Sequence, residues 1–172
     1  DTNFLKTLPE KETVFGLIEV WKHALLVQDY KIIQAIEYYL SGCAKLDETQ
    51  IIKFSLEAKR HFVEVDYNDK MGVHKALSLG HTLANYLELT FDLRHGPAVF
   101  YGIIFVVLLS YNLKMINKEK FENIMQTVKL FENKIGLLNN VQGKLRVVDV
   151  MHRLKFDKIN HGNFYTFVVL TN

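Results

Sequence analysis

Apolar residues recur along most of this chain three or four residues apart, the spacing that places them on one face of a helix. Start signals precede these stretches: a Thr-x-x-Glu capping box, or Asp and Asn at the first position. The pattern predicts about seven helices. They open at Thr7-Leu8-Pro9-Glu10, Asp29, Asp47, Val73, the His95-Gly96-Pro97 break, Asn117 and Lys144.

Stop signals and turns divide these helices. Gly42 and Gly136 are expected to end two of them, and the polar stretch 66–72 reads as a loop. The helix from Val73 is expected to run unbroken to about Leu89, and the last one from Lys144 to Phe156. Only Phe164–Leu170 has the composition of a strand. The sequence therefore predicts a single all-α domain over residues 1–172 with one terminal β-strand.

Composition narrows the class of protein. With 172 residues, 49% of them hydrophobic, the chain is long enough to bury a core. A net charge of +2, with scattered Lys and Arg, does not indicate a nucleic-acid partner. The single cysteine excludes an internal disulfide and favours a reducing, cytoplasmic location. Cys43 itself is expected to be a small buried apolar side chain.

No membrane segment is expected. The apolar run Ala98–Leu109 is shorter than the roughly 18 residues that usually signal a span, so a central buried helix is the better interpretation. Charged residues near the start, among them Lys6 and Glu10, argue against a signal peptide. The chain starts at Asp1 rather than Met, and its terminal strand has no good partner. We expect a piece of a longer polypeptide, although pairing with a partner chain would also satisfy that strand.

Three residues on separate predicted helices have the chemistry of metal ligands. Glu19 lies in an apolar helix, where a carboxylate needs a partner such as a metal ion, Lys22 or His23, unless it faces solvent. His81 follows Gly80 and could equally be a core histidine, and His95 could be a cap. Jointly they supply the Glu/His/His set of an open Zn²⁺ site, in which the metal acts as a Lewis acid.

Several short motifs in a fixed order resemble one family. They are Phe4-Leu5-Lys6-Thr7-Leu8-Pro9, Gly16-x-x-Glu19-Val20-x-Lys22-His23, Gly80-His81-Thr82, His95-Gly96-x-Ala98-Val99 and Asp157-Lys158. Over nearly its whole length, the chain resembles the C-terminal domain of 3-dehydroquinate synthase and its sugar-phosphate cyclase relatives.

The resemblance implies a helical domain that supplies metal ligands at Glu19, His81 and His95. It implies that Lys22 and Lys158 contact a sugar-phosphate-like substrate. It also implies that NAD binds to a separate N-terminal domain, so no residue of this chain is expected to bind that cofactor. The implied metal is Zn²⁺ or another divalent ion. The implied reaction is transient oxidation of a ring hydroxyl by NAD, phosphate elimination, re-reduction, ring opening and aldol closure. Homodimers are common in the family.

Four positions depart from the family pattern. Asn85 stands where the family has a second histidine, so proton transfer there is lost or moved. His74 replaces an arginine, Ser78 replaces an asparagine, and Ile159 replaces a second lysine. A phosphate-facing lysine is represented by Lys59 or Arg60, depending on where a one-residue slip is placed. We expect these substitutions to weaken phosphate binding or to change the direction from which the phosphate is bound.

Several functions remain open on these residues. The chain could belong to a 3-dehydroquinate synthase that tolerates the changes, to a cyclase with another substrate, or to a metal-binding homologue with little catalysis. From other classes, an iron-dependent, glycerol dehydrogenase-like alcohol dehydrogenase and a purely structural module remain. Because no dinucleotide-binding motif is present, the isolated chain is expected to be inactive.

Overall fold

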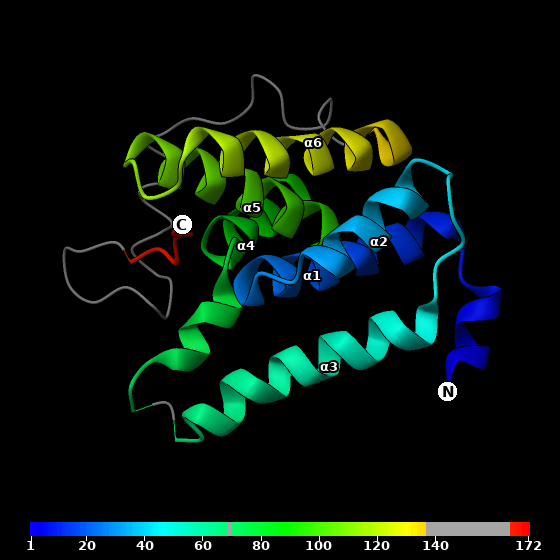
Figure 1. Ribbon diagram of the computed structural model, residues 1–172, viewed down its shortest axis with the longest axis horizontal. Helices are drawn as coiled ribbons and strands as arrows, with labels where there is room; N and C mark the ends of the chain where they lie inside the picture. Colours follow the sequence, from blue (N-terminus) through cyan, green and yellow to red (C-terminus); the bar gives the residue numbers. More distant parts are fainter. Residues whose placement is uncertain (69, 137–165) are drawn as a thin grey trace. The chain divides into compact units, whose positions relative to one another are not determined.

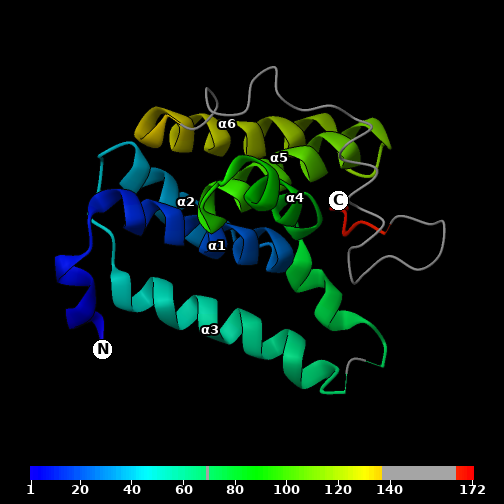
Figure 2. The same cartoon turned by 180° about the vertical axis from the view of Figure 1, so that it is seen from behind.

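The computed structural model describes residues 1–68, 70–136 and 166–172. Every regular element in those ranges is a helix, which confirms the all-α fold class (Figures 1 and 2). The expected helix over Lys144–Phe156 lies outside the described residues. The elements are the 3-10 helix η1 (Thr2–Thr7), α1 (Glu10–Val27), α2 (Tyr30–Leu40), α3 (Glu48–Val65), the 3-10 helix η2 (Val73–Ser78), α4 (His81–Phe91), α5 (His95–Asn112) and α6 (Lys118–Ile135).

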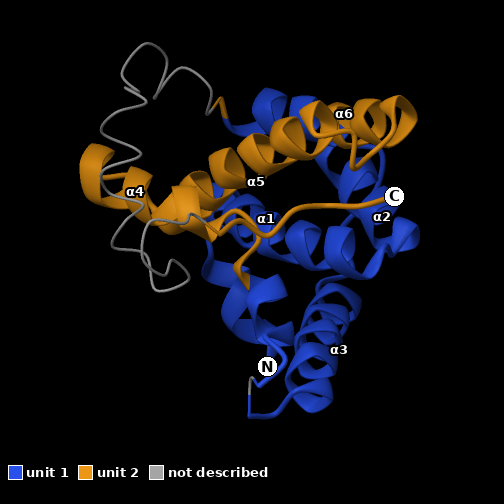
Figure 3. Cartoon of the chain, turned by 90° about the vertical axis from the view of Figure 1, so that its left-hand side faces the viewer, with its two compact units in different colours: residues 1–77, 127–135 blue, residues 78–126, 136–172 orange. Residues whose placement is uncertain are grey.

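The chain divides into two compact units, coloured separately in Figure 3. Unit 1 comprises residues 1–77 and 127–135, and unit 2 comprises residues 78–126 and 136–172. That both fold together as one domain stays a prediction from the sequence.

Unit 1 is built around α1. This helix packs against α2 and α3, and its Val14, Ile18 and Trp21 are fully buried. The indole of Trp21 also meets the ring of Phe131 from α6, with 5.4 Å between the centroids. Because apolar side chains leave α1 on more than one face, this helix forms the core of the unit.

Most of the predicted helix starts are confirmed. The carboxylates of Asp29 and Asp47 and the side-chain amide of Asn117 accept hydrogen bonds from first-turn backbone N–H groups. The capping box predicted at Thr7 is wrong, because its hydroxyl donates to the carbonyl of Phe4 in the preceding turn. Among the described residues no side chain caps the start of α1.

The predicted loop after α3 is organised by one carboxylate. Asp66 is 5% exposed and accepts hydrogen bonds from the backbone N–H groups of Lys70, Met71 and Val73. Burial alone would raise the pKa of Asp66, but these three donors and the nearby His74 together hold the pKa below its ordinary value. The charged form of Asp66 therefore ties the loop to the end of α3.

The helix predicted from Val73 to Leu89 is interrupted. A 3-10 helix ends at Ser78, and α4 begins only at His81. Between them Gly80 adopts φ +80°, a left-handed conformation that side chains rarely allow. The prediction of one continuous helix was wrong because helical periodicity does not register a single glycine that reverses the backbone.

Unit 2 is built on the contact between α4 and α5. Gly80 lies directly against Gly102 of α5: a Cβ atom added to Gly102 would clash with the carbonyl oxygen of Gly80 and lie 2.7 Å from its carbonyl carbon. A Cβ atom on Gly80 would lie 2.9 Å from the backbone nitrogen of Ile103. Two glycines thus let the start of α4 touch the backbone of α5.

The apolar helix α5 is longer than the run that predicts it, because residues 95–97 and 110–112 extend it to 18 residues. By length and composition alone it could cross a membrane, yet half of it is buried inside the chain. Val99, Phe100 and Ile103 are fully buried. The core helix of a globular domain has these same properties, as the sequence predicts for this run.

The strand predicted over Phe164–Leu170 is not formed by residues 166–170, and Phe164 and Tyr165 lie outside the described residues. Leu170 is buried, and its backbone N–H donates to Oγ of Ser110 at 3.0 Å. The backbone N–H of Asn172 donates to the carbonyl oxygen of Met115. Acceptors on α5 and just after it therefore satisfy these two backbone N–H groups.

The prediction that Cys43 is buried was wrong. Its side chain is exposed, just beyond the end of α2. Gly42, with φ +76°, turns the chain there, and the backbone N–H of Cys43 donates to the carbonyl of Tyr38. The backbone closes the helix end, and the thiol points outward.

Gly102→Ala tests the close approach in unit 2. The added methyl must push α4 and α5 apart, so we expect the free energy of unfolding to fall by about 1–3 kcal/mol in urea titrations. Gly16→Ala is the matched control, because a Cβ atom there meets nothing within 4 Å and the site is inside α1. It should stabilise the chain by up to about 1 kcal/mol. Equal effects of the two substitutions would contradict the proposed contact.

Candidate metal centre

His81 is held by the backbone that precedes it. It is the first residue of α4, and its Nδ1 lies 3.2 Å from the carbonyl oxygen of Leu79. A carbonyl oxygen can only accept, so Nδ1 carries the proton and Nε2 carries the lone pair. The left-handed conformation of Gly80 brings that carbonyl and the ring together.

His95 is held by a side chain of the neighbouring helix. It is the first residue of α5, and its Nδ1 lies 3.0 Å from Oε1 of Glu88 on α4. An ionised carboxylate also only accepts, which again places the lone pair of the neutral ring on Nε2. Both histidines therefore leave the lone pair on the same nitrogen, which is the atom that could bind a metal ion.

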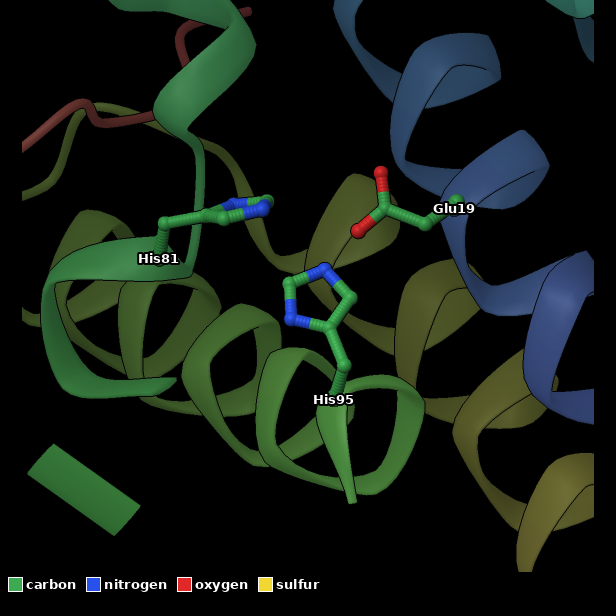
Figure 4. Close-up of side chains that lie close together, drawn as sticks. All are labelled: Glu19, His81 and His95. Atoms are coloured by element: carbon green, nitrogen blue, oxygen red, sulfur yellow. The ribbon is translucent and has the colours of Figure 1, made fainter. Parts of the chain in front are cut away.

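The two rings lie at a separation that suits one shared ion. Their centroids are 5.3 Å apart and their planes are inclined by 56°. Figure 4 shows the two side chains, which come from α4 and α5. Two imidazoles bound through Nε2 to a tetrahedral Zn²⁺ have centroids roughly 5.2 Å apart, given Zn–N bonds of about 2.0–2.1 Å. The histidine pair of unit 2 therefore fits a divalent metal.

Glu19 lies on α1 in unit 1, where it forms an ion pair. Its Oε2 is 2.7 Å from Nζ of Lys22, one turn further along the helix, and Figure 4 shows its carboxylate. The side chain of Lys22 is 4% exposed and also donates to the carbonyl oxygen of Leu77 at 2.8 Å. Lys22 is thus a buried, oriented ammonium group, and its contact with a substrate stays a prediction.

The pKa of Lys22 lies below its ordinary value. Burial lowers the pKa of Lys22, the carboxylate of Glu19 raises it in part, and the positive charge of Lys59 on α3 lowers it further. Of the two residues open for the phosphate-facing position, Lys59 is the one whose charge reaches Lys22. Arg60 is exposed and pairs with Glu64 of its own helix at 3.6 Å, and its substrate role stays a prediction.

The remaining predicted substrate residues are dispersed over several elements. His74 in η2 lies with Nε2 3.4 Å from the carbonyl oxygen of Val63, and its charge acts on the Asp66 loop. Ser78 ends η2 and is partly buried, and Asn85 is exposed on α4 one turn after His81. Lys158 lies outside the described residues. Their predicted roles toward a substrate stay predictions.

Comparison with known proteins assigns the family. The family model described as 3-dehydroquinate synthase C-terminal matches residues 16–160. The chain belongs to this family. The resemblance stated from the sequence motifs is confirmed, and with it the assignment as a C-terminal domain of the 3-dehydroquinate synthase type.

Several curated proteins are similar to the chain. The bifunctional 3-dehydroquinate synthase/phosphatase of Fusobacterium nucleatum is 38% identical over 138 residues, 77% of this chain and 21% of that protein. The 3-dehydroquinate synthases of Acetivibrio thermocellus and Chlorobium luteolum are each 31% identical over 98% and 99% of this chain. The chain spans 46% and 48% of those two proteins, less than half of each relative named here.

Glu88 is the contact that the sequence prediction missed. It stands seven residues after His81, two turns along the same face of α4. An acidic residue on the stripe that carries a candidate ligand is a signal that could have been used. Its partner could not be read from the sequence, because only the reversal of the chain between α4 and α5 brings His95 to that face.

Lys22→Met tests the buried ammonium group. Methionine keeps the apolar stem but leaves the carbonyl of Leu77 and the carboxylate of Glu19 without this donor. We expect the free energy of unfolding to fall by about 1–3 kcal/mol. Lys53→Met is the matched control, because that side chain is 75% exposed and its pair with Glu57 is 3.9 Å long. Its effect should stay within about 0.5 kcal/mol in the same thermal or urea titration. Similar losses for both would contradict the structural role of Lys22.

Proposed function

We propose that this chain is the metal- and substrate-binding domain of a 3-dehydroquinate synthase-like enzyme that uses NAD and a divalent metal ion. In this proposal Glu19 joins His81 and His95 as the third ligand. One carboxylate and two imidazoles are a donor set that could hold Zn²⁺ with a position left for substrate. The family membership of the chain supports the proposal.

The observation that carries the proposal is the histidine pair of unit 2. Each ring donates a hydrogen bond from Nδ1 to an oxygen acceptor. Nε2 of both histidines therefore carries the lone pair that a metal ion could accept. Two such rings 5.3 Å apart on adjoining helix starts have the spacing of co-ligands. A purely structural role for the pair would not require this match.

Each group then has a distinct task. The metal, when bound, supplies a Lewis acid that polarises hydroxyl and carbonyl oxygens of the substrate. Lys22 is positioned by Glu19 and Leu77 to hold an anionic oxygen of a sugar-phosphate-like substrate. NAD is proposed to bind to an N-terminal domain outside this chain, in a cytoplasmic enzyme. The homodimer expected from the resemblance stays a prediction.

Asn85 favours a second candidate function, a divergent homologue whose reaction differs from that of the relatives. A side-chain amide does not titrate near neutral pH, so Asn85 cannot act as a general acid or base. It lies one turn from the proposed ligand His81. A metal site could persist while the acid-base step is changed or lost.

Zinc content tests the metal centre. The purified 172-residue chain, prepared without chelator, should contain about one Zn²⁺ per chain by elemental analysis. His81→Ala and His95→Ala should each abolish stoichiometric binding, because removing one of three protein ligands leaves too few donors. His61→Ala, an exposed histidine on α3, is the control and should bind like the wild type. Metal-free wild type would exclude the proposed centre.

Catalysis should require the NAD-binding domain. We expect the isolated 172-residue chain, loaded with Zn²⁺ and supplied with NAD and the sugar-phosphate substrate of 3-dehydroquinate synthases, to release no phosphate above background. A colourimetric phosphate assay measures this, with a complete 3-dehydroquinate synthase as the positive control. NAD-dependent phosphate release by the chain alone would overturn the division of labour proposed here.

A further inference from the structure

His95 differs from His81 in how its ring is held. The side chain of His95 is 54% exposed, so packing alone does not fix the rotation of the ring. Its Nδ1 lies 3.0 Å from Oε1 of Glu88, a hydrogen bond that orients the ring. Glu88 is itself 33% exposed and lies on α4.

We propose that Glu88 is the positioning residue of this metal centre, which holds His95 in the tautomer and orientation that present Nε2 to the ion. The inference rests on the proposed function and deepens it. A ligating histidine commonly donates its other N–H to a carboxylate or a carbonyl, which fixes the ring and raises the basicity of the ligating nitrogen. Glu88 and the carbonyl of Leu79 supply these two acceptors for His95 and His81.

The alternative is that Glu88 and His95 form an ordinary surface ion pair, which typically contributes only about 0–1 kcal/mol to stability. The placement of Glu88 on α4 argues for more. Residues 81 and 88 are separated by two turns on one face, so a single helix carries one ligand and the support of the other. The glycine contact at Gly80 and Gly102 sets α4 against α5. The ligand pair and its support are therefore positioned together.

The two supports also differ in a way that can be tested. The acceptor for His81 is a backbone carbonyl, which no side-chain substitution removes. The acceptor for His95 is a side chain and can be removed without touching either ligand. A substitution at Glu88 should therefore weaken metal binding through one histidine only.

The experiment measures Zn²⁺ affinity of the 172-residue chain by competition with a chromophoric chelator. Glu88→Ala should bind Zn²⁺ about 10–100-fold more weakly than the wild type. Glu88→Gln should fall between them, because its amide oxygen still accepts but carries no charge. Glu122→Ala is the matched control: this glutamate is also in unit 2, pairs with Lys118 at 3.6 Å and is 61% exposed. It should bind like the wild type.

A second measurement reports on the ring itself. In ¹⁵N NMR spectra of the metal-free chain at about pH 8, the wild-type signals of His95 should show the Nδ1–H tautomer. Glu88→Ala should shift His95 toward Nε2–H, the tautomer that neutral imidazole favours in water. The signals of His81 should not change, because its acceptor is the backbone.

The outcomes separate this inference from the proposed function. Wild type that binds no Zn²⁺ overturns the metal centre, and the role of Glu88 with it. Zinc binding that is lost in His95→Ala but unchanged in Glu88→Ala, or an unaltered His95 tautomer, overturns the role of Glu88 alone. If circular dichroism shows that Glu88→Ala is unfolded, the nearly isosteric Glu88→Gln decides, and affinity equal to that of the wild type then overturns the inference.

Discussion

The close approach of Gly80 and Gly102 is the constraint on which the candidate centre depends. With a side chain at either position, the carbonyl of Gly80 and the backbone of α5 could not touch. That contact sets the start of α4 against α5, and the ring of His81 follows from it directly. Because helices in packed interiors cannot shift by a methyl group without cost, the distance between the two histidines is determined by backbone packing more than by the histidines themselves.

Charge places a second constraint, in unit 1. An ammonium as buried as that of Lys22 would be costly without partners, and it has a carboxylate and a carbonyl within hydrogen-bonding distance. The carboxylate of Glu19 thus already neutralises one positive charge, that of Lys22.

The helices could be predicted from the sequence, because periodicity and caps are local signals. Glu19, His81 and His95 could be named as candidate ligands from their chemistry, and that ligand set stays a prediction. Asp29 and Asp47, for example, cap the helices that follow them, as their positions predict. The break at Gly80 could not be predicted, since its cause is Gly102, twenty-two positions along the chain. The same holds for Glu88, whose partner is reached only after the chain reverses, and for Leu170, whose acceptor Ser110 lies far away in sequence. Cys43 was misread because residue type predicts burial only on average.

Metal retention and proton transfer place different demands on α4, which is why one can change while the other persists. Holding an ion requires lone pairs at fixed positions. In the proposed centre, Leu79 and Glu88 would fix those of His81 and His95. In the proposed enzyme, moving a proton would require a titratable group at one further position, which the resemblance places one turn along at Asn85. That position is exposed, so its substitution disturbs neither the core nor the ligands. The proposed metal centre would therefore constrain the fold and the cofactor more tightly than it constrains the reaction.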